Sequence, residues 1–133
     1  MKIKVGDKAS STRIFDDITV RKFAELTGDY NKIHFDSKYT KSTIFKKPIV
    51  HGPLVITLIT TIFAKELPGE GSIYLSHDVK YLAPVYFNDI ITAEVEVIEI
   101  TDKKHIILKT ICKNEKNNIV IDGIARLKKF NDI

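Results

Sequence analysis

The most informative segment for the fold reads His51-Gly-Pro-Leu-Val-Ile-Thr-Leu-Ile-Thr-Thr-Ile-Phe-Ala-Lys-Glu-Leu-Pro-Gly69. Its many β-branched residues favour a strand locally, but its apolar run is longer than most strands. Pro53 suits the first turn of a helix, and Pro68 followed by Gly69 suits the end of one. We therefore predict a helix over about residues 53–66.

This helix is apolar on nearly every side, which indicates that it is buried. It is also too short for a membrane span, which needs about 20 apolar residues. We therefore expect a helix at the centre of one domain, and no membrane partner.

After Gly71 the apolar residues recur at every second position, which is the period of a half-buried strand. Turn-like residues at 102–104 and 114–118 make the connections short, so neighbouring strands should be antiparallel. With one strand near the N-terminus, the predicted strands cover residues 11–15, 72–82, 90–100, 106–113 and 119–127.

These elements predict an α+β domain in which an antiparallel sheet of about five strands wraps around the central helix. A chain of 133 residues fits one core, so we expect a single domain over residues 1–133. Because the helix is apolar all round, one such sheet would leave part of it exposed. We therefore predict a homodimer, or a larger assembly, in which a second copy covers that part.

A short helix and a long irregular segment are expected between the first strand and the central helix. Thr19 is the expected N-cap, residues 20–26 follow helical spacing, and Gly28 supplies the stop. No single period persists over residues 30–50. Long loops in compact domains are usually functional, so this segment is where we expect a site.

The composition is that of an ordinary globular protein, with 44% hydrophobic and 29% charged residues. The net charge of +4 comes from scattered lysines and arginines, which argues against a nucleic-acid partner. Lys46 and Lys47 are candidates for contacting the phosphates of a ligand such as coenzyme A. The single cysteine, Cys112, and the lack of an apolar leader over residues 1–9 favour a cytoplasmic protein.

A carboxylate, an amide and an imidazole follow the first helix closely, at Asp29, Asn31 and His34. In a continuous helix Asp29 and His34 would lie about 140° apart, so the break at Gly28 is needed for them to converge. On residue types alone, a turn-capping aspartate and a packed histidine remain an alternative interpretation.

The start of the central helix, at His51-Gly52-Pro53, is a second candidate site. Amides at a helix N-terminus form a ready site for an oxyanion such as a thioester enolate, and Gly52 allows a ligand to approach closely. The alternative is that Gly52 only permits the turn. His51 is interpreted as a residue that shapes this turn.

Five segments carry a resemblance that runs, in order, through nearly the whole chain. They are Thr27-Gly-Asp-Tyr-Asn-Lys-Ile-His34, Lys47-Pro-Ile-Val-His-Gly52, Leu67-Pro-Gly-Glu-Gly-Ser-Ile-Tyr-Leu75, Leu82-Ala-Pro-Val85 and Asp89-Ile-Ile-Thr-Ala-Glu-Val-Glu-Val97. Together they resemble the MaoC-like hydratases, specifically the (R)-specific enoyl-CoA hydratases. The resemblance implies a hot-dog fold that works as a dimer.

The resemblance also implies roles for individual residues. Asp29 and His34 match the catalytic pair, and Gly52 matches the backbone oxyanion donor. Asn31 is implied as a supporting residue, as is Thr60, which stands where close relatives have a serine. Lys32 departs from the family, which usually has proline at this position.

The implied reaction is the reversible hydration of a trans-2-enoyl-CoA to an (R)-3-hydroxyacyl-CoA, which makes the expected enzyme a hydro-lyase. The thioester is the substrate, and no metal or redox cofactor is expected, because the sequence has neither a His/Cys cluster nor a glycine-rich dinucleotide loop. The nearest alternative is a 3-hydroxyacyl-[acyl-carrier-protein] dehydratase of fatty acid synthesis. A hot-dog thioesterase and a non-catalytic binding or oligomerisation domain are further alternatives.

Overall fold

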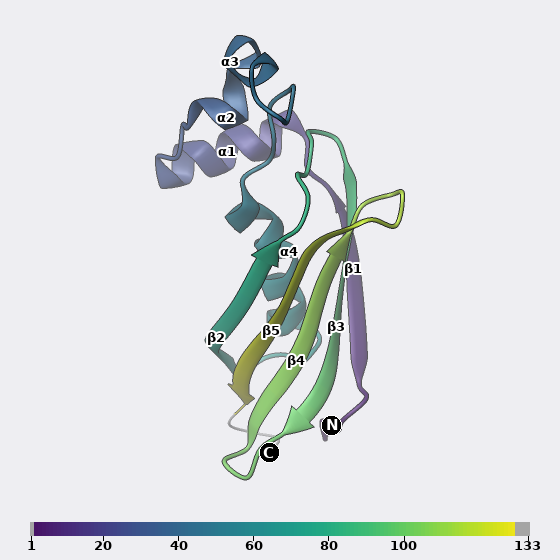
Figure 1. The fold of residues 1–133 in the computed structure, drawn as a ribbon. Helices are drawn as coiled ribbons and strands as arrows, with labels where there is room; N and C mark the ends of the chain where they lie inside the picture. The colour runs from purple at the N-terminus through teal and green to yellow at the C-terminus, as the bar shows by residue number, and fades with distance from the viewer. Residues whose placement is uncertain (1, 130–133) are drawn as a thin grey trace.

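The computed structural model describes residues 2–129. Within them the chain forms a mixed α+β architecture, with the helices in the first half and most of the strands in the second (Figure 1). In chain order the elements are β1 (Lys8–Ile14), α1 (Asp17–Thr27), α2 (Lys32–Phe35), α3 (Ser37–Lys41), α4 (Gly52–Lys65), β2 (Ser72–Tyr81), β3 (Ile90–Ile100), β4 (His105–Lys113) and β5 (Ile119–Lys129).

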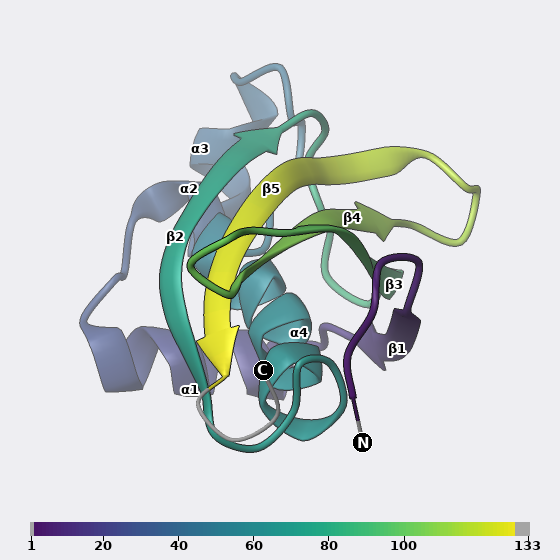
Figure 2. The same cartoon turned by 90° about the horizontal axis from the view of Figure 1, so that it is seen from below.

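The strands form one five-stranded antiparallel sheet in the order β1-β3-β4-β5-β2. Seen along the strands in Figure 2, the sheet curves around α4, so that the helix lies against its concave face. This arrangement confirms the predicted hot-dog fold, a sheet wrapped around one long helix. The short connections after β3 and β4 make these strands antiparallel neighbours, as the turn-like sequences predicted.

The central helix α4 begins with Gly52 and Pro53 and ends at Lys65, close to its predicted limits. Its core-facing stripe is buried, whereas Thr61, Ala64 and Lys65 on other sides are exposed. In this single chain the helix is therefore covered on one side only. The buried residues of the stripe are Leu54, Val55, Leu58, Ile59, Ile62 and Phe63.

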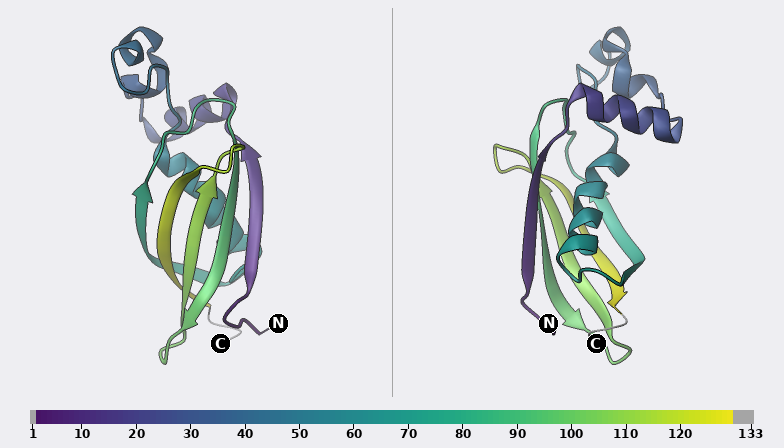
Figure 3. Two further views of the ribbon diagram at one scale, coloured as in Figure 1. Left: turned by 45° about the vertical axis from the view of Figure 1, so that its right-hand side comes forward. Right: turned by 180° about the vertical axis from the view of Figure 1, so that it is seen from behind.

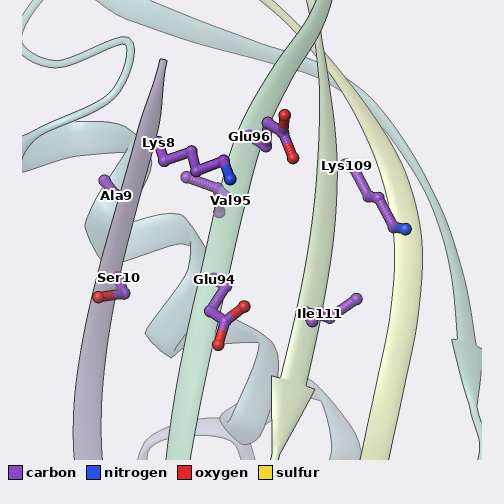
Figure 4. A pocket seen from close by; sticks show the side chains of 8 residues that line it. All are labelled: Lys8, Ala9, Ser10, Glu94, Val95, Glu96, Lys109 and Ile111. Carbon is purple, nitrogen blue, oxygen red and sulfur yellow. The ribbon is translucent and has the colours of Figure 1, made fainter. Parts of the chain in front are cut away.

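Strand β3 alternates as its sequence predicted, whereas none of the residues of β2 is fully buried. In β3 the inward side chains of Ile91, Ala93, Val95 and Val97 are buried and belong to the core. The outward side chains include Glu94 and Glu96, which line a charged hollow of about 450 Å³ together with Lys8 of β1 and Lys109 of β4 (Figure 4). This hollow lies on the face of the sheet away from α4, so it belongs to the solvated side.

Two expectations about the N-terminal half are wrong. The N-cap of α1 is Asp16, not Thr19, because the Asp16 carboxylate stands before the first turn and accepts a hydrogen bond of 2.9 Å from the Thr19 amide. Residues 30–50 are not wholly irregular, since they contain the short helices α2 and α3. Each of these helices is only about one turn long, which is too short to give a sequence period.

Figure 3 shows that α1, α2 and α3 gather at one end of the sheet, where α4 begins. The turn between β3 and β4 lies at the opposite end. None of the helices within residues 2–129 has both the length and the apolar character that crossing a bilayer requires.

Candidate active site

The site begins where α1 ends. Gly28 adopts a left-handed conformation, with φ of 82°, and its amide donates to the Ala24 carbonyl. A residue with a side chain is strained in this conformation, so glycine is suited to the stop. The chain can then turn sharply and place Asp29 directly beyond the helix.

Two successive side-chain caps shape the segment after Gly28. The Asp29 carboxylate accepts from the Asn31 amide at 3.2 Å, and the Asn31 side chain accepts from the Ile33 amide at 3.2 Å. Such caps replace the backbone bonds that an interrupted helix lacks. They start α2 at Lys32 and bring His34 back towards Asp29, as predicted for this pair.

His34 is buried, with 8% of its surface exposed, and its orientation is fixed. Its Nδ1 lies 2.8 Å from the carbonyl oxygen of Ile49. Because a carbonyl only accepts, Nδ1 must carry the proton, which leaves an unprotonated Nε2 in the neutral ring. Burial lowers the pKa of His34, while the Ile49 carbonyl and the Asp29 carboxylate oppose this shift. His34 is therefore arranged as a neutral base.

His51, the residue before Gly52, belongs to the same cluster. It is fully buried, and its ring stacks on that of His34 with 3.7 Å between centroids and 27° between planes. Its Nε2 lies 2.9 Å from the main-chain carbonyl oxygen of Asp29. The interpretation of His51 as a residue that only shapes the turn missed these contacts. Its place directly after the apolar pair Ile49-Val50 was a weak signal of burial.

Asp29, His34 and His51 each bring a potential ligand atom to within 4.8 Å of the others. This set of groups is one that divalent metals use. However, one nitrogen of each imidazole is bonded to a main-chain carbonyl, and the stacking of the rings, with 27° between their planes, is a poor geometry for both remaining nitrogens to bind one ion. The arrangement therefore favours acid/base chemistry over metal binding.

An apolar cavity of about 550 Å³ opens beside the cluster. His34 and Gly52 both contribute to its wall, while most of the remaining lining is hydrophobic. Apolar pockets with a few converging polar groups are typical ligand sites. The other lining residues are Ile44, Phe45, Ile49, Val50, Pro53, Val55, Tyr81, Leu82, Ala83, Pro84, Val85 and Ile121.

Gly52 is the first residue of α4, where amides have no partner within the helix. A Cβ at this position would lie 2.4 Å from the ring of the exposed Tyr81, which would have to move, so glycine allows the close packing seen here. The amide end of α4 is thus accessible at the cavity wall and suits an oxygen that develops negative charge.

The remaining predicted residues lie further from the pair. Thr60 is two turns along α4, and its hydroxyl donates to the Thr57 carbonyl at 3.2 Å. No hydrogen bond within residues 2–129 links it to Asp29 or His34. Lys47 lines a second hollow of about 260 Å³, and His34 lines it too. Lys46 is not among the residues that line this hollow.

Comparison with known proteins gives consistent matches over almost the whole chain. The family model described as the MaoC like domain matches residues 3–119. The (R)-specific enoyl-CoA hydratase of Aeromonas caviae is 39% identical over 127 residues, which cover 95% of each chain. That of Rhodospirillum rubrum is 35% identical over 124 residues, which cover 92% of this chain and 85% of the relative.

One further relative is named for a different carrier. The mitochondrial 3-hydroxyacyl-[acyl-carrier-protein] dehydratase of Arabidopsis thaliana is 35% identical over 127 residues, covering 92% of this chain and 75% of the relative. Among solved structures, the A. caviae (R)-hydratase involved in PHA biosynthesis superposes with a TM-score of 0.90 at 35% identity, covering 96% of this chain and 98% of that one.

Proposed function

The chain belongs to the MaoC-like domain family, and from this premise we propose that it catalyses the reversible hydration of a trans-2-enoyl-CoA to an (R)-3-hydroxyacyl-CoA. One observation carries the proposal: His34 and Gly52 line the same apolar cavity, with Asp29 beside His34. This is the set of groups that the reaction needs, namely an acid/base pair and an oxyanion site next to space for an acyl chain.

The reaction adds the elements of one water molecule across a carbon–carbon double bond. The water oxygen bonds to C3, the π bond between C2 and C3 breaks, and C2 gains a proton. Negative charge develops on the thioester oxygen before that proton arrives. Catalysis therefore requires a base, a proton donor and a group that stabilises the oxygen.

We assign the acid/base work to Asp29 and His34. The bond from Nδ1 to the Ile49 carbonyl leaves Nε2 of His34 as the free lone pair, so this nitrogen can accept a proton from water. The Asp29 carboxylate provides a second acceptor that orients the same water. The protonated member of the pair then returns the proton to C2, and the Gly52 amide holds the thioester oxygen.

Two supporting assignments follow the same reasoning. Asn31 holds the loop by capping α2, so its role is to position Asp29 and His34. Thr60 is proposed as a second supporting residue because it lies on α4, although its hydroxyl is bonded within the helix. Lys47, at the second hollow, is the proposed contact for phosphate groups of the carrier.

The test is the loss of absorbance of the conjugated thioester when crotonyl-CoA is mixed with the purified protein. We expect rapid loss with the wild type and a loss slower by about 100-fold or more with Asp29→Asn, as general acid–base groups contribute about 10²–10⁴-fold. Asp102→Asn is the matched control, because Asp102 is an exposed carboxylate in the connection between β3 and β4, and this connection lies at the opposite end of the sheet (Figure 1). Chiral analysis of the 3-hydroxyacyl product checks the (R) configuration.

The second candidate is dehydration on an acyl carrier protein, which the Arabidopsis relative's name favours. The reacting end of the thioester is identical in both cases, so the acid/base groups cannot distinguish them. Crotonyl groups on coenzyme A and on a carrier protein should be compared at equal concentration. A kcat/KM at least about tenfold higher on the carrier protein would move the assignment to the second candidate.

We also propose that the working form is a homodimer in the cytoplasm. The one cysteine, Cys112, is free and buried, which suits a reducing compartment. Strand β2 lies at an edge of the sheet, and several of its apolar side chains are exposed. An edge of this kind is a template for pairing with another chain.

A further inference from the structure

We propose that His51 is a positioning residue for the acid/base pair: it holds the main chain of Asp29 through Nε2 and supports the ring of His34 through stacking. This inference rests on the proposed hydratase function and adds a residue to the site. His51 does not touch the substrate cavity, since its side chain is fully buried behind His34. Its effect must therefore pass through its two neighbours.

The first contact fixes Asp29. The carbonyl oxygen of Asp29 is only an acceptor, so Nε2 of His51 must donate the hydrogen across 2.9 Å. The carboxylate itself is exposed, and among the described residues, 2–129, its hydrogen-bond donor is the Asn31 amide. The bond from His51 therefore joins the main chain at Asp29 to the residue directly before Gly52, where α4 begins. It holds the main chain of Asp29 close to the start of α4.

The second contact fixes His34. The rings of His34 and His51 stack with 3.7 Å between their centroids. The rings of Phe23 and Phe35 pack against His51 at an angle, with centroid distances of 5.0 and 5.9 Å. One face of the His34 ring therefore packs on the buried His51 ring, and its Nδ1 is bonded to the Ile49 carbonyl. A ring held at both places points Nε2 in one direction, which is the requirement for an effective base.

A stability role alone does not explain a histidine at this position. With Nε2 as donor, Nδ1 of His51 is an unprotonated acceptor, and this atom is buried without a hydrogen-bond partner within residues 2–129. A buried polar atom without a hydrogen-bond partner destabilises the folded state. Phenylalanine would fill the same aromatic cluster without that cost. The unpartnered Nδ1 of His51 is therefore explained by the need for the Nε2–H donor on the same ring.

Two variants separate the contacts. His51→Phe retains a stacking ring and removes the donor, whereas His51→Gln retains an N–H near Nε2 and removes the ring. We expect kcat of His51→Phe to fall by about 10- to 100-fold with KM nearly unchanged, the size of effect that small misplacement of catalytic groups produces. His51→Gln should recover part of that loss, and the loss that remains in this variant measures the stacking contact. The thermal midpoint of His51→Phe should not fall, because the unsatisfied nitrogen is removed as well.

His105→Phe is the matched control, because His105 stands at the start of β4, away from the site, and should leave kcat unchanged. Wild-type kcat in His51→Phe would overturn the proposal. So would equal losses in His51→Phe and His51→Gln that follow the loss of thermal stability, since that pattern belongs to a purely structural residue.

A measurement without substrate keeps this test separate from the proposed reaction. Long-range proton–nitrogen NMR spectra of the imidazoles at pH 8, assigned with the variants, report which nitrogen of each ring is protonated. We expect Nε2–H for His51 and Nδ1–H for His34. The opposite tautomer at His51 would exclude the bond to Asp29 and overturn the proposal, even in an active enzyme. The expected tautomers in a protein that hydrates no enoyl thioester would reject the proposed function and leave this geometry standing.

Discussion

The two ring nitrogens of His34 differ in protonation, because one of them is bonded to a main-chain carbonyl. Nδ1 is committed to the Ile49 carbonyl, one residue before the buried Val50 that leads into α4. Nε2 remains free. Because the acceptor is a backbone atom, no side-chain substitution nearby can easily reverse the tautomer. The backbone therefore determines that Nε2, and not Nδ1, is the nitrogen that can accept a proton.

The pH dependence of activity should reflect this environment. Burial lowers the pKa of His34 from its ordinary value of 6.5, and the neutral ring is the active base. The acid limb of kcat/KM, which reports the free enzyme, should therefore lie below pH 6.5. The measurement is the initial rate of crotonyl-CoA hydration between pH 4.5 and 8, in steps of about half a unit. An acid limb above 6.5 would contradict the assignment of His34 as the buried base.

The lowered pKa of His34 also makes the free energy of unfolding depend on pH. The unfolded chain binds the His34 proton more tightly than the folded chain, because the folded pKa is the lower of the two. The contribution of neutral His34 is complete above pH 6.5 and is lost as the pH falls through the folded pKa. Urea unfolding at several pH values should show a decline in that window that is smaller in His34→Gln. Equal declines in both proteins would show that other groups cause it.

Cys112 provides a test of burial at a single atom. Burial raises the pKa of its thiol to about 12, so almost none of it is thiolate at pH 8. Native protein should therefore leave an aromatic disulfide reagent unreacted at pH 8 for as long as the fold persists. Addition of a denaturant should release one equivalent of thiol. Rapid reaction of the native protein would mean that the core around β4 opens easily.

The short helix α2 illustrates how a local element carries the site. Asn31 caps it, and its ψ of 134° lies in the range that a residue before proline prefers. Lys32 is its first residue, where an amide has no helical partner. Proline thus fits this position, as the resemblance to the family suggested.

Lys32→Pro should therefore stabilise the protein. A proline that fits the native backbone typically adds about 0.4–1 kcal/mol by restricting the unfolded chain. The thermal midpoint should rise by about 2–5 °C, and kcat should stay the same or increase as the loop becomes more rigid. Differential scanning calorimetry provides the measurement, with Lys38→Ala as an exposed control in α3. A lower midpoint would show that the Lys32 amide has a partner that proline removes.

The long elements could be predicted from sequence because each has a period and clear ends. Pro53 and Pro68 mark the limits of α4, and strict alternation marks β3. Helices α2 and α3 could not be predicted in this way, since each depends on one side-chain cap, from Asn31 and from Asp36. A cap followed by a single turn is indistinguishable in sequence from an ordinary turn.

The candidate site could be predicted only in part for a related reason. Asp29, Asn31 and His34 are close in sequence, and a glycine stop before them signals convergence. His51 is far from them along the chain, and nothing local reveals that its ring stacks on His34. A contact that depends on where α4 meets the loop after α1 is a property of the folded chain.

For the molecule as a whole, the two edges of the sheet differ in character. Edge strand β1 is rich in serine and threonine, whereas edge strand β2 exposes apolar side chains. Tyr81, the last residue of β2, and Leu82 directly after it also line the apolar cavity beside His34. A partner at this edge would therefore cover exposed apolar surface and one wall of the cavity together. The exposed apolar residues are Ile73, Tyr74, Leu75, Tyr81 and Leu82, at 45–56% of their surface.

We accordingly predict a homodimer that forms through β2 and that is needed for full activity. Sedimentation velocity should give twice the chain mass of 15.1 kDa for the wild type. Leu75→Lys should shift the protein to the monomer and lower kcat/KM, because an edge lysine opposes strand pairing. Ile98→Lys is the matched control, an equally exposed apolar residue on the internal strand β3. A wild type that sediments at 15.1 kDa and is fully active would reject pairing at this edge and would require that one chain alone closes the cavity.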